Sequence, residues 1–472
     1  MADNPTPDTF YALVTGANSP SGLGFAICTR LIDEFLQTRP QSQTLHLILT
    51  TRSRQKCEDS ISRLEHHLET TYRDIERKLP GARLLLLQRV RFQGEICDLT
   101  SILSVQCLCQ KLLGTEVAGG VERLDVIILN AGIGGWIGVN WGNAIWTILT
   151  DWVHATTWPT LKRSAVGWVA RPQLLPTAST ANGTVSGKSH GAEGDAAENG
   201  ETKEKEPPLG EVFAANVFGH YLLAHYLAPL LSASSRAPEQ RGRIIWLSSL
   251  EAYAHSLRLD DFQGLRHDLA YESSKRITDV LALTSEMPST APWVTKYLSC
   301  DTSTSASGTT NEKNGAQTAK PKIYVAHPGI CSTGIFPLPW ILGLFMTASF
   351  YVARWLGSPW HTCLPYQGAC APVWLALAAQ STLDSIEETE GKGKWGSATD
   401  WRGRDRVART EVEGWGWGGR VGEETRRGRW RYAKDLTKES RVEFEELGRA
   451  CWREMEGLRE EWEERLRDAG LS

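Results

Sequence analysis

Short apolar runs alternate along the chain with longer segments in which apolar residues recur every three or four positions. The short runs are typical of buried strands, and the longer periodic segments are typical of amphipathic helices. This alternation predicts an α/β fold with a doubly wound parallel sheet. The predicted strands are residues 10–15, 45–50, 83–87, 92–97, 124–129, 243–247 and 322–326, and the predicted helices are residues 23–36, 57–78, 99–113, 212–231 and 271–283.

Two segments interrupt the alternation without ending it. Residues 177–208 and 299–321 are rich in small polar residues and lack apolar periodicity, and the pattern resumes after each. They are predicted to be solvated, low-complexity insertions in a single domain of residues 8–390. Residues 391–472 are charged and rich in Trp, and residues 442–466 have the periodicity of an amphipathic helix. We expect this C-terminal extension to be a helical appendage to the sheet.

The composition excludes several kinds of partner. A net charge of −4 over 472 residues gives no electrostatic reason to expect nucleic acid. The ten cysteines show no Cys-x-x-Cys or Cys/His ligand spacing, so no metal site is expected. The polar N-terminus lacks the basic start and apolar core of a secretory signal. A reducing, cytosol-facing compartment is therefore predicted.

A glycine-rich turn follows the first predicted strand. It contains Gly16, Gly22 and Gly24 and leads into a predicted helix. Glycine allows the backbone to turn tightly and to approach a pyrophosphate, whose charge then lies at the helix N-terminus. A simple strand-to-helix turn is the alternative. The position at the first strand of an alternating sheet favours a nucleotide site.

The residues after the other predicted strands indicate which nucleotide is bound. A carboxylate after the second strand would bind the adenosine ribose hydroxyls, but the chain has Arg52 and Arg54 there. Guanidinium groups suit a 2′-phosphate, so NADPH is favoured over NADH, with solvated loop residues as the alternative. Asp98 is placed to accept a hydrogen bond from the adenine amino group. Asn130 begins an Asn-Ala-Gly segment whose backbone allows close approach of a ligand.

Four further residues suggest the transfer of a hydride and a proton to a ketone. Tyr271 and Lys275 lie four residues apart, on one face of a predicted helix. An ammonium about 4 Å from a phenol, at an effective dielectric of about 20, favours the phenolate by about 4 kcal/mol, or roughly three pKa units. Lys275 is thus predicted to tune Tyr271 as a general acid/base. Ser249 can donate a hydrogen bond to the ketone oxygen, and Asn216 can orient Lys275 through a bound water.

These motifs, in this order, resemble those of the short-chain dehydrogenase/reductases. The matching residues are the glycine-rich turn, Asn130-Ala131-Gly132, Asn216, Ser249, Tyr271 with Lys275, and Pro328-Gly329. Within that family the chain is similar to the fungal 3-ketosteroid reductases of sterol synthesis. This closer likeness depends on residues 15–36, Thr50-Thr51-Arg52-Ser53, residues 216–221 and the long spacing between Ser249 and Tyr271. The resemblance covers residues 10–379 apart from the two insertions.

The resemblance implies roles for individual residues in a Rossmann-like domain. Tyr271 would be the proton donor, and Ser249 would donate a hydrogen bond to the carbonyl. Lys275 would adjust the pKa of Tyr271 and bind the nicotinamide ribose. Besides Lys275 and the glycines of the turn, the residues that would contact NADPH are Tyr271, Leu23, Thr51, Arg52, Asp98, Asn130 and Ser332. One departure from the family pattern is the longer glycine turn, in which five residues separate Gly16 from Gly22. The additional residues Pro20 and Ser21 either bulge outward or weaken phosphate binding.

The resemblance also implies a pathway and a location. The activity would be reduction of the C-3 ketone of sterol intermediates to the 3β-alcohol during C-4 demethylation in ergosterol biosynthesis. The implied partners are the other C-4 demethylation enzymes, a cyclase and a membrane surface. The implied location is the endoplasmic reticulum membrane and lipid droplets. Two alternatives remain: reduction of another apolar carbonyl, such as retinal or a long-chain ketone, and a non-enzymatic scaffold of a sterol-enzyme complex.

The apolar residues 335–357 are predicted to close over a flat, rigid hydrocarbon substrate. They approach the length of a membrane crossing, but Pro337, Pro339 and Arg354 argue against a continuous helix. Dipping into a membrane interface is favoured over spanning or full burial. Trp340, Trp355 and Trp360 would suit an interfacial belt.

Overall fold

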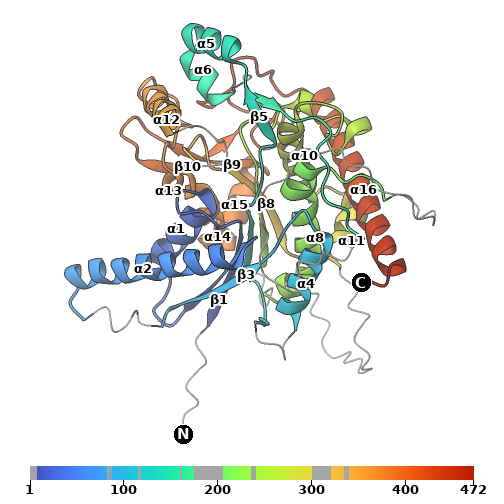
Figure 1. The fold of residues 1–472 in the computed structure, drawn as a ribbon. Coiled ribbons are helices and arrows are strands. Elements are labelled where there is room, and N and C mark those ends of the chain that lie inside the picture. Colours follow the sequence, from blue (N-terminus) through green and yellow to red (C-terminus); the bar gives the residue numbers. More distant parts are fainter. Residues whose placement is uncertain are drawn as a thin grey trace.

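A central twisted sheet with helices on both faces forms the body of the protein (Figure 1). The computed structural model describes residues 8–81, 86, 88–114, 119–159, 162–174, 206–234, 241–299, 320–333 and 340–471. The main strands are β1 (Thr9–Thr15), β2 (Thr44–Thr51), β3 (Val90–Ile96), β4 (Val126–Leu129), β7 (Arg243–Leu247), β8 (Lys322–His327), β9 (Lys394–Thr399) and β10 (Asp405–Thr410). Their order in the sheet is β10-β9-β8-β7-β4-β1-β2-β3.

All neighbouring strands of this sheet pair in parallel except β9 and β10. The chain moves outward from β1 to β3 and then returns to place β4 on the other side of β1. The carboxyl ends of β1 and β4 therefore flank a topological switch point, where doubly wound sheets bind ligands. The predicted fold class is confirmed. The strand predicted at residues 83–87 falls mostly outside the described residues.

Hydrophobic clusters cover both faces of the sheet. One face packs against α1 (Leu23–Thr38), α2 (Arg54–Lys78) and α14 (Cys370–Leu377). The opposite face packs against α4 (Ile102–Leu113), α8 (Gly219–Tyr226), α10 (Ala270–Thr284) and α16 (Lys438–Asp468). The remaining helices are α5 (Trp141–Thr150), α6 (Trp152–Thr157), α7 (Glu211–Phe213), α9 (Ala228–Ala233), α11 (Ala291–Leu298), α12 (Trp340–Trp355), α13 (Pro365–Gly368) and α15 (Gln380–Glu390), with short 3-10 turns η2 (Ala254–Ser256) and η3 (Leu259–Asp261).

The helix predicted at residues 212–231 is interrupted twice. Residues Ala214–Phe218 form a π-helical stretch, η1, between α7 and α8. A single non-helical residue, Leu227, separates α8 from α9, because Pro229 at the start of α9 has no backbone N–H to continue the helix. Asn216 lies inside the π-helical stretch, and such stretches are frequent at functional sites.

The sequence predicted that the C-terminal extension is an appendage outside the sheet, and this prediction is wrong. β9 pairs in parallel with β8 and continues the sheet, and β10 pairs with β9. All six residues of β9 are buried although its sequence is Lys-Trp-Gly-Ser-Ala-Thr, so no apolar run indicated a strand. A methyl group on Gly396 would lie 2.4 Å from His327 Nε2. The strand therefore needs small residues at that point rather than large apolar ones.

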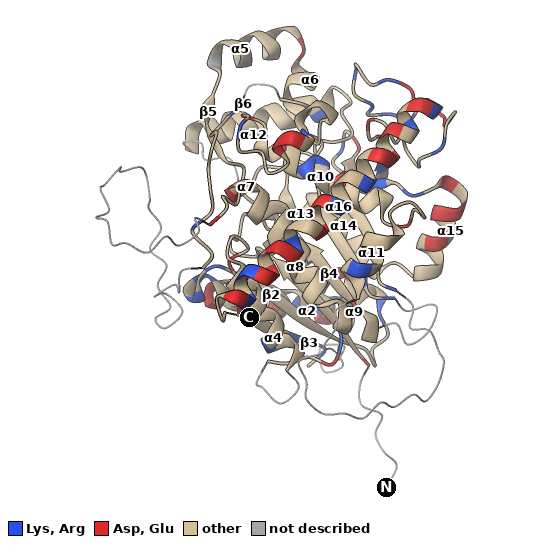
Figure 2. Cartoon of the chain, turned by 90° about the vertical axis from the view of Figure 1, so that its right-hand side faces the viewer, with Lys and Arg blue, Asp and Glu red and all other residues tan. Residues whose placement is uncertain are grey.

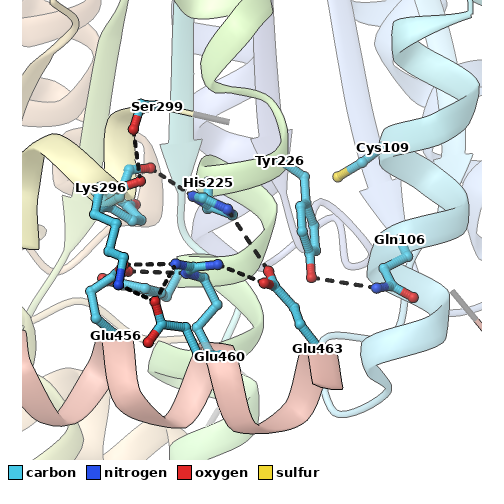
Figure 3. Close-up of polar contacts among 12 residues, drawn as sticks. Gln106, Cys109, His225, Tyr226, Lys296, Ser299, Glu456, Glu460 and Glu463 are labelled. Carbon is cyan, nitrogen blue, oxygen red and sulfur yellow. Dashed lines mark hydrogen bonds and ion pairs between the residues drawn. The ribbon is translucent and has the colours of Figure 1, made fainter. Parts of the chain in front are cut away.

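Helix α16 lies across α10 and α11 and completes the core on that face (Figures 1 and 2). Its apolar side chains, including Trp452 and Trp462, belong to the same cluster as the sheet residues. Figure 3 shows the polar contacts of this helix, among them His225 of α8 facing Glu463 at 3.8 Å and Lys296 of α11 paired with Glu460. Most described Trp residues of the extension are buried, so its Trp content indicates core packing rather than a partner surface.

Candidate active site

A cavity of about 970 Å³ opens at the carboxyl ends of the central strands. Its floor is formed by residues that follow β1, β2, β3, β4, β7 and β8. Its roof comes from α12 and from an excursion after β4 that the sequence did not predict. This excursion comprises the antiparallel strands β5 (Trp136–Val139) and β6 (Lys162–Ser164), with α5 and α6 between them.

The glycine-rich turn at one end of the cavity is packed too tightly to accept side chains. Gly16 has a φ of +75°, and a methyl group there would lie 2.8 Å from Ala131 Cα. A methyl group on Gly24 would lie 2.5 Å from Gly16 O and 2.6 Å from Asn130 Nδ2. Gly22 caps α1 without a side-chain hydrogen bond, and Gly22, Leu23 and Gly24 line the cavity. This cradle fits the pyrophosphate of a dinucleotide, because backbone N–H groups at a helix N-terminus bind anions.

The additional residues of the turn bulge outward. Gly22 N donates to Ser19 O at 2.9 Å, which closes a turn that leaves Pro20 and Ser21 exposed. Asn18 and Ser19 line the cavity, whereas Pro20 and Ser21 do not. The structure thus has the first of the two geometries that the sequence left open.

The polar residues expected to hold the adenosine half surround this end of the cavity. Thr51, Arg52 and Asp98 all line it, whereas Arg54 begins α2 outside it. Burial raises the pKa of Glu211, and the nearby Arg52 guanidinium opposes that shift. Asp98 Oδ1 accepts hydrogen bonds from Thr100 N at 3.0 Å and Thr100 Oγ1 at 2.8 Å. These contacts hold the carboxylate at the cavity rim.

A buried histidine that the sequence analysis overlooked links three segments of the site. Thr15 Oγ1 accepts from Asn130 N at 2.9 Å and from Ala131 N at 3.0 Å, and it lies 2.8 Å from His220 Nε2. His220 Nδ1 then donates to Asn216 O at 3.2 Å. Burial lowers the pKa of His220 to about 3, which keeps it in this neutral form. The chain of bonds fixes η1 against the ends of β1 and β4.

The residues expected to be catalytic meet at the middle of the cavity. Tyr271 and Lys275 share one face of α10, with Lys275 Nζ 5.7 Å from the centroid of the Tyr271 ring. Ser249 follows β7, and its hydroxyl accepts from Glu251 N at 3.1 Å. Tyr271, Lys275 and Ser249 all line the cavity.

Burial dominates the acid–base properties of this pair. It raises the pKa of Tyr271, the Glu251 carboxylate raises it further, and a hydrogen bond with Ser249 opposes the shift. Burial also lowers the pKa of Lys275 to about 8, as does the nearby Lys394 ammonium. Lys275 Nζ donates to Leu247 O at 2.8 Å. Tyr271 is therefore held as a protonated phenol, and the predicted effect of Lys275 on its pKa stays a prediction.

Asn216 and Ser332 lie beside the cavity rather than on its surface. Asn216 Oδ1 accepts from Ile133 N at 2.8 Å, and its Nδ2 donates to Ile133 O and Ser274 Oγ, each at 3.0 Å. The water relay from Asn216 to Lys275 stays a prediction. Ser332 Oγ is hydrogen-bonded to Thr347 Oγ1 of α12 at 2.9 Å. Its neighbours in the sequence, Cys331 and Thr333, line the cavity.

A buried ion pair behind the site comes partly from the C-terminal extension. Lys394 Nζ of β9 lies 2.7 Å from Asp279 Oδ2 of α10 and donates to Ser249 O at 2.6 Å. Asp279 lies four residues after Lys275 on the same helix. The pair therefore ties the loop that carries Ser249 to the helix that carries Tyr271. No signal in the sequence connects Lys394 with this site.

The other end of the cavity is apolar. Its walls come from α5, α6 and α12, which lie together above the sheet (Figure 1). Helix α12 is continuous up to Trp355 although Arg354 was expected to disfavour a helix. Arg354 is buried in the last turn and donates to His361 O at 2.8 Å, so its charge lies at the favourable C-terminal end of the helix dipole. The prolines at 337 and 339 lie outside the described residues. The apolar lining includes Ile148, Trp152, Leu342, Met346, Phe350 and Val352.

Comparison with known proteins assigns the chain to a family. The 3-keto-steroid reductase erg27 of Aspergillus fumigatus is 46% identical over 470 residues, covering 97% of this chain and 95% of the relative. The chain belongs to the 3-keto-steroid reductase family. The corresponding protein ERG27 of Gibberella zeae is 38% identical over 97% of this chain and 95% of the relative. That of Schizosaccharomyces pombe is 30% identical over 85% of this chain and 90% of the relative.

The resemblance stated from the motifs is thereby confirmed, and the chain is an oxidoreductase. No family model matches the chain. Similar solved structures include a 7α-hydroxysteroid dehydrogenase, with 14% identity, a TM-score of 0.38 and coverage of 81% of this chain and 92% of that chain. Another is the L-sorbose reductase of Gluconobacter frateurii, with 14% identity, a TM-score of 0.37 and coverage of 77% and 88%. Neither likeness bears on the substrate.

Proposed function

We propose that the protein reduces the C-3 ketone of sterol intermediates to the 3β-alcohol with NADPH, during C-4 demethylation in ergosterol biosynthesis. The observation that carries this proposal is that one cavity joins a glycine cradle, the Tyr271–Ser249 pair and an apolar chamber. Membership of the 3-keto-steroid reductase family supports the choice of substrate. NADPH supplies the hydride when it is bound.

The residues present fit this cofactor. The turn from Gly16 to Gly24 holds the pyrophosphate, because its tightly packed glycines bring the backbone to the cavity wall and the α1 N-terminus attracts anions. Arg52 at the cavity rim binds the 2′-phosphate, and Asp98 binds the adenine amino group. Lys275 lies within the cavity where it can bind the nicotinamide ribose.

Two hydroxyl groups act on the ketone oxygen. The Ser249 hydroxyl accepts a hydrogen bond from Glu251 N and is also hydrogen-bonded to Tyr271, so its own proton is available to the ketone oxygen once the substrate lies beside both groups. The Tyr271 phenol, kept protonated by burial, gives its proton to the same oxygen as the C-3 carbon is reduced. Lys275 stabilises the phenolate that remains until the proton is replaced from solvent.

Turnover of two classes of apolar carbonyl compound tests the substrate assignment. Purified protein is incubated with NADPH and either a 4-demethylated 3-oxosterol or all-trans retinal, and NADPH oxidation is followed. We expect oxidation with the sterone and a much lower kcat/KM with retinal. Preferential turnover of retinal would support the alternative of another apolar carbonyl. Tight NADPH binding without reduction of either compound would support a scaffold.

Replacement of Arg52 by alanine tests the choice of NADPH. Removing a charge-assisted bond to the 2′-phosphate is expected to raise the KM for NADPH by roughly 10- to 100-fold, corresponding to about 1.5–3 kcal/mol. The KM for NADH should change little, because NADH has no 2′-phosphate. Arg54→Ala is the matched control, since Arg54 lies outside the cavity lining. Equal effects of Arg52→Ala on both cofactors would contradict the assignment.

We also propose that the protein binds a membrane surface, at the endoplasmic reticulum and lipid droplets, through the roof of the cavity. Among the described residues, no helix has the length and hydropathy needed to cross a bilayer. Helix α5 carries no charged residue (Figure 2), and the one charged residue of α12, Arg354, is buried. The two helices expose large apolar side chains beside the substrate chamber, namely Ile145, Trp146, Leu149, Trp340, Ile341, Leu344 and Phe345.

Combined replacement of Trp146, Leu149, Trp340 and Leu344 by serine is expected to weaken vesicle binding at least about tenfold. Each large apolar side chain that enters lipid contributes about 1.5–3 kcal/mol to the free energy of binding. None of the four side chains lines the cavity. Co-sedimentation with phosphatidylcholine vesicles measures the effect, and Trp401→Ser, at a residue 61% exposed on the C-terminal extension, is the control. Unchanged sedimentation would remove α5 and α12 from the membrane surface.

The same membrane surface would bring the protein to the other C-4 demethylation enzymes and to the cyclase, which we propose as partners. The exposed, charged face of α16 is the surface of the extension that we propose contacts them (Figure 2). Co-purification from membranes, compared between the native protein and a variant with serine at Glu446, Arg453 and Glu464 of α16, tests this surface. Undiminished recovery of partners would exclude it.

A further inference from the structure

An ion pair lies in the catalytic cavity without a part in the hydride and proton transfers. Lys162 Nζ of β6 is 2.6 Å from both Oε1 and Oε2 of Glu251, in the loop after β7. Both residues line the cavity, and their side chains are only 16% and 6% exposed. The attraction in such a pair barely repays the cost of removing two charges from water. Stability alone therefore gives little reason for the pair to be there.

The pair contacts both hydroxyl residues of the proposed mechanism. Glu251 N donates to Ser249 Oγ at 3.1 Å. Lys162 Nζ lies 3.9 Å from the centroid of the Trp136 ring and 5.8 Å from that of Tyr271. The Trp136 and Tyr271 rings are themselves 4.8 Å apart. Strand β6, the loop after β7 and α10 thus meet at this pair.

We propose that Lys162 and Glu251 are positioning residues that clamp the β5–β6 hairpin onto the Ser249 loop and balance the charge beside the Tyr271 phenol. This inference rests on the proposed ketone reduction. The clamp holds Trp136 against Tyr271 and so fixes the orientation of the phenol. The charge balance matters because the carboxylate and the ammonium act on the phenol in opposite directions.

The groups that face Tyr271 come from every element around it. They are Lys275 and Glu272 of α10, Ser249 and Glu251 of the loop after β7, Lys162 of β6, and Cys331 of the loop after β8. Glu251 raises the pKa of Tyr271 and, after burial, is the main cause that raises the pKa of Glu272 to about 7. Lys162 opposes the shift at Glu272.

The direction in which each substitution shifts the pKa of Tyr271 follows from the charges of Glu251 and Lys162. In Glu251→Gln the carboxylate is gone and the Lys162 ammonium remains, so the pKa of Tyr271 falls. In Lys162→Met the carboxylate is uncompensated, so the pKa of Tyr271 rises. Reduction needs the protonated phenol, and its rate is lost as pH rises through the Tyr271 pKa. Glu251→Gln therefore moves the alkaline limb of the kcat profile to lower pH.

Titration of the phenol in the NADP⁺-bound protein tests the inference. The protein is labelled with ¹³C-tyrosine, and the Tyr271 resonance is identified by its loss in Tyr271→Phe. We expect Glu251→Gln to titrate at least about one pH unit below the native protein, and Lys162→Met above it. The double variant should return close to the native value, and Lys162→Arg should retain it. The value of kcat for the sterone should fall in Glu251→Gln and Lys162→Met, recover in part in the double variant and be retained in Lys162→Arg. KM should change less than kcat in each variant.

The titration does not depend on turnover, so it separates this inference from the proposed function. A shifted resonance in a protein that reduces no sterone would support the charge balance and reject the reaction. Normal sterone reduction with an unshifted resonance in Glu251→Gln would overturn the inference and leave the reaction intact. Thermal unfolding is measured for each variant. If Lys162→Met does not fold, the Glu251→Gln and Lys162→Arg variants decide the outcome.

Discussion

Replacement of Tyr271 by phenylalanine is expected to lower kcat for ketone reduction by roughly 10²- to 10⁴-fold, the usual contribution of a general acid. The ring remains to pack against Trp136, 4.8 Å away, but the proton for the C-3 oxygen is gone. NADPH affinity should stay within a few-fold of the native value, because the glycine cradle and Arg52 are untouched.

Initial rates with a 3-oxosterol, together with NADPH binding by fluorescence, measure this result. Tyr432→Phe is the control, since Tyr432 is 61% exposed and lies outside the cavity lining. Native-like kcat in Tyr271→Phe, with the fold shown intact by circular dichroism, would contradict the assigned proton donor.

Replacement of Lys394 by methionine is expected to lower the free energy of unfolding by about 3–5 kcal/mol. The substitution leaves the Asp279 carboxylate, whose side chain is 1% exposed, without its cation. It also removes the hydrogen bond from Lys394 Nζ to Ser249 O. The loop that carries Ser249 should then loosen, so activity should fall along with stability.

Urea denaturation of the native and variant proteins gives the change in the free energy of unfolding. Lys392→Met is the matched control two residues away and should cost less, because its partner Glu286 is 45% exposed and keeps a second cation, Lys322, at 3.1 Å. The double variant Lys394→Met with Asp279→Leu should recover much of the loss, since no buried charge is then left unpaired. A loss in Lys394→Met no larger than that in Lys392→Met would show that β9 is not integral to the reductase.

The sequence alone was sufficient for six of the eight strands of the central sheet and for the residues along the carboxyl edge of those strands. Apolar runs predicted β1, β2, β4, β7 and β8, because a parallel strand buried on both faces is continuously apolar, and the strand-like residues 92–97 predicted β3 at the sheet edge. The glycine turn and the spacing of Tyr271 and Lys275 indicated chemistry, because both depend on local backbone geometry. These elements place the cofactor cradle and the proton donor in one cavity.

The parts that sequence reasoning missed depend on contacts between distant residues. Strand β9 is buried by packing of small residues against His327 and Trp360, and no periodicity in the sequence reveals this. Lys394 reaches the site only because β9 pairs with β8. The Lys162–Glu251 pair joins residues 89 positions apart. Burial, which no local motif reveals, is likewise the main cause that raises the pKa of Tyr271.

The central claim is that the chain's own site delivers hydride and proton to the C-3 carbonyl of a sterol. NADPH deuterated at the transferable hydrogen is incubated with the purified protein and a 4-demethylated 3-oxosterol, and the products are analysed by mass spectrometry. We expect the 3β-alcohol with a single deuterium at C-3 from the native protein, and almost none from Tyr271→Phe. Recovery of unlabelled sterone from the native protein, despite bound NADPH, would contradict the account.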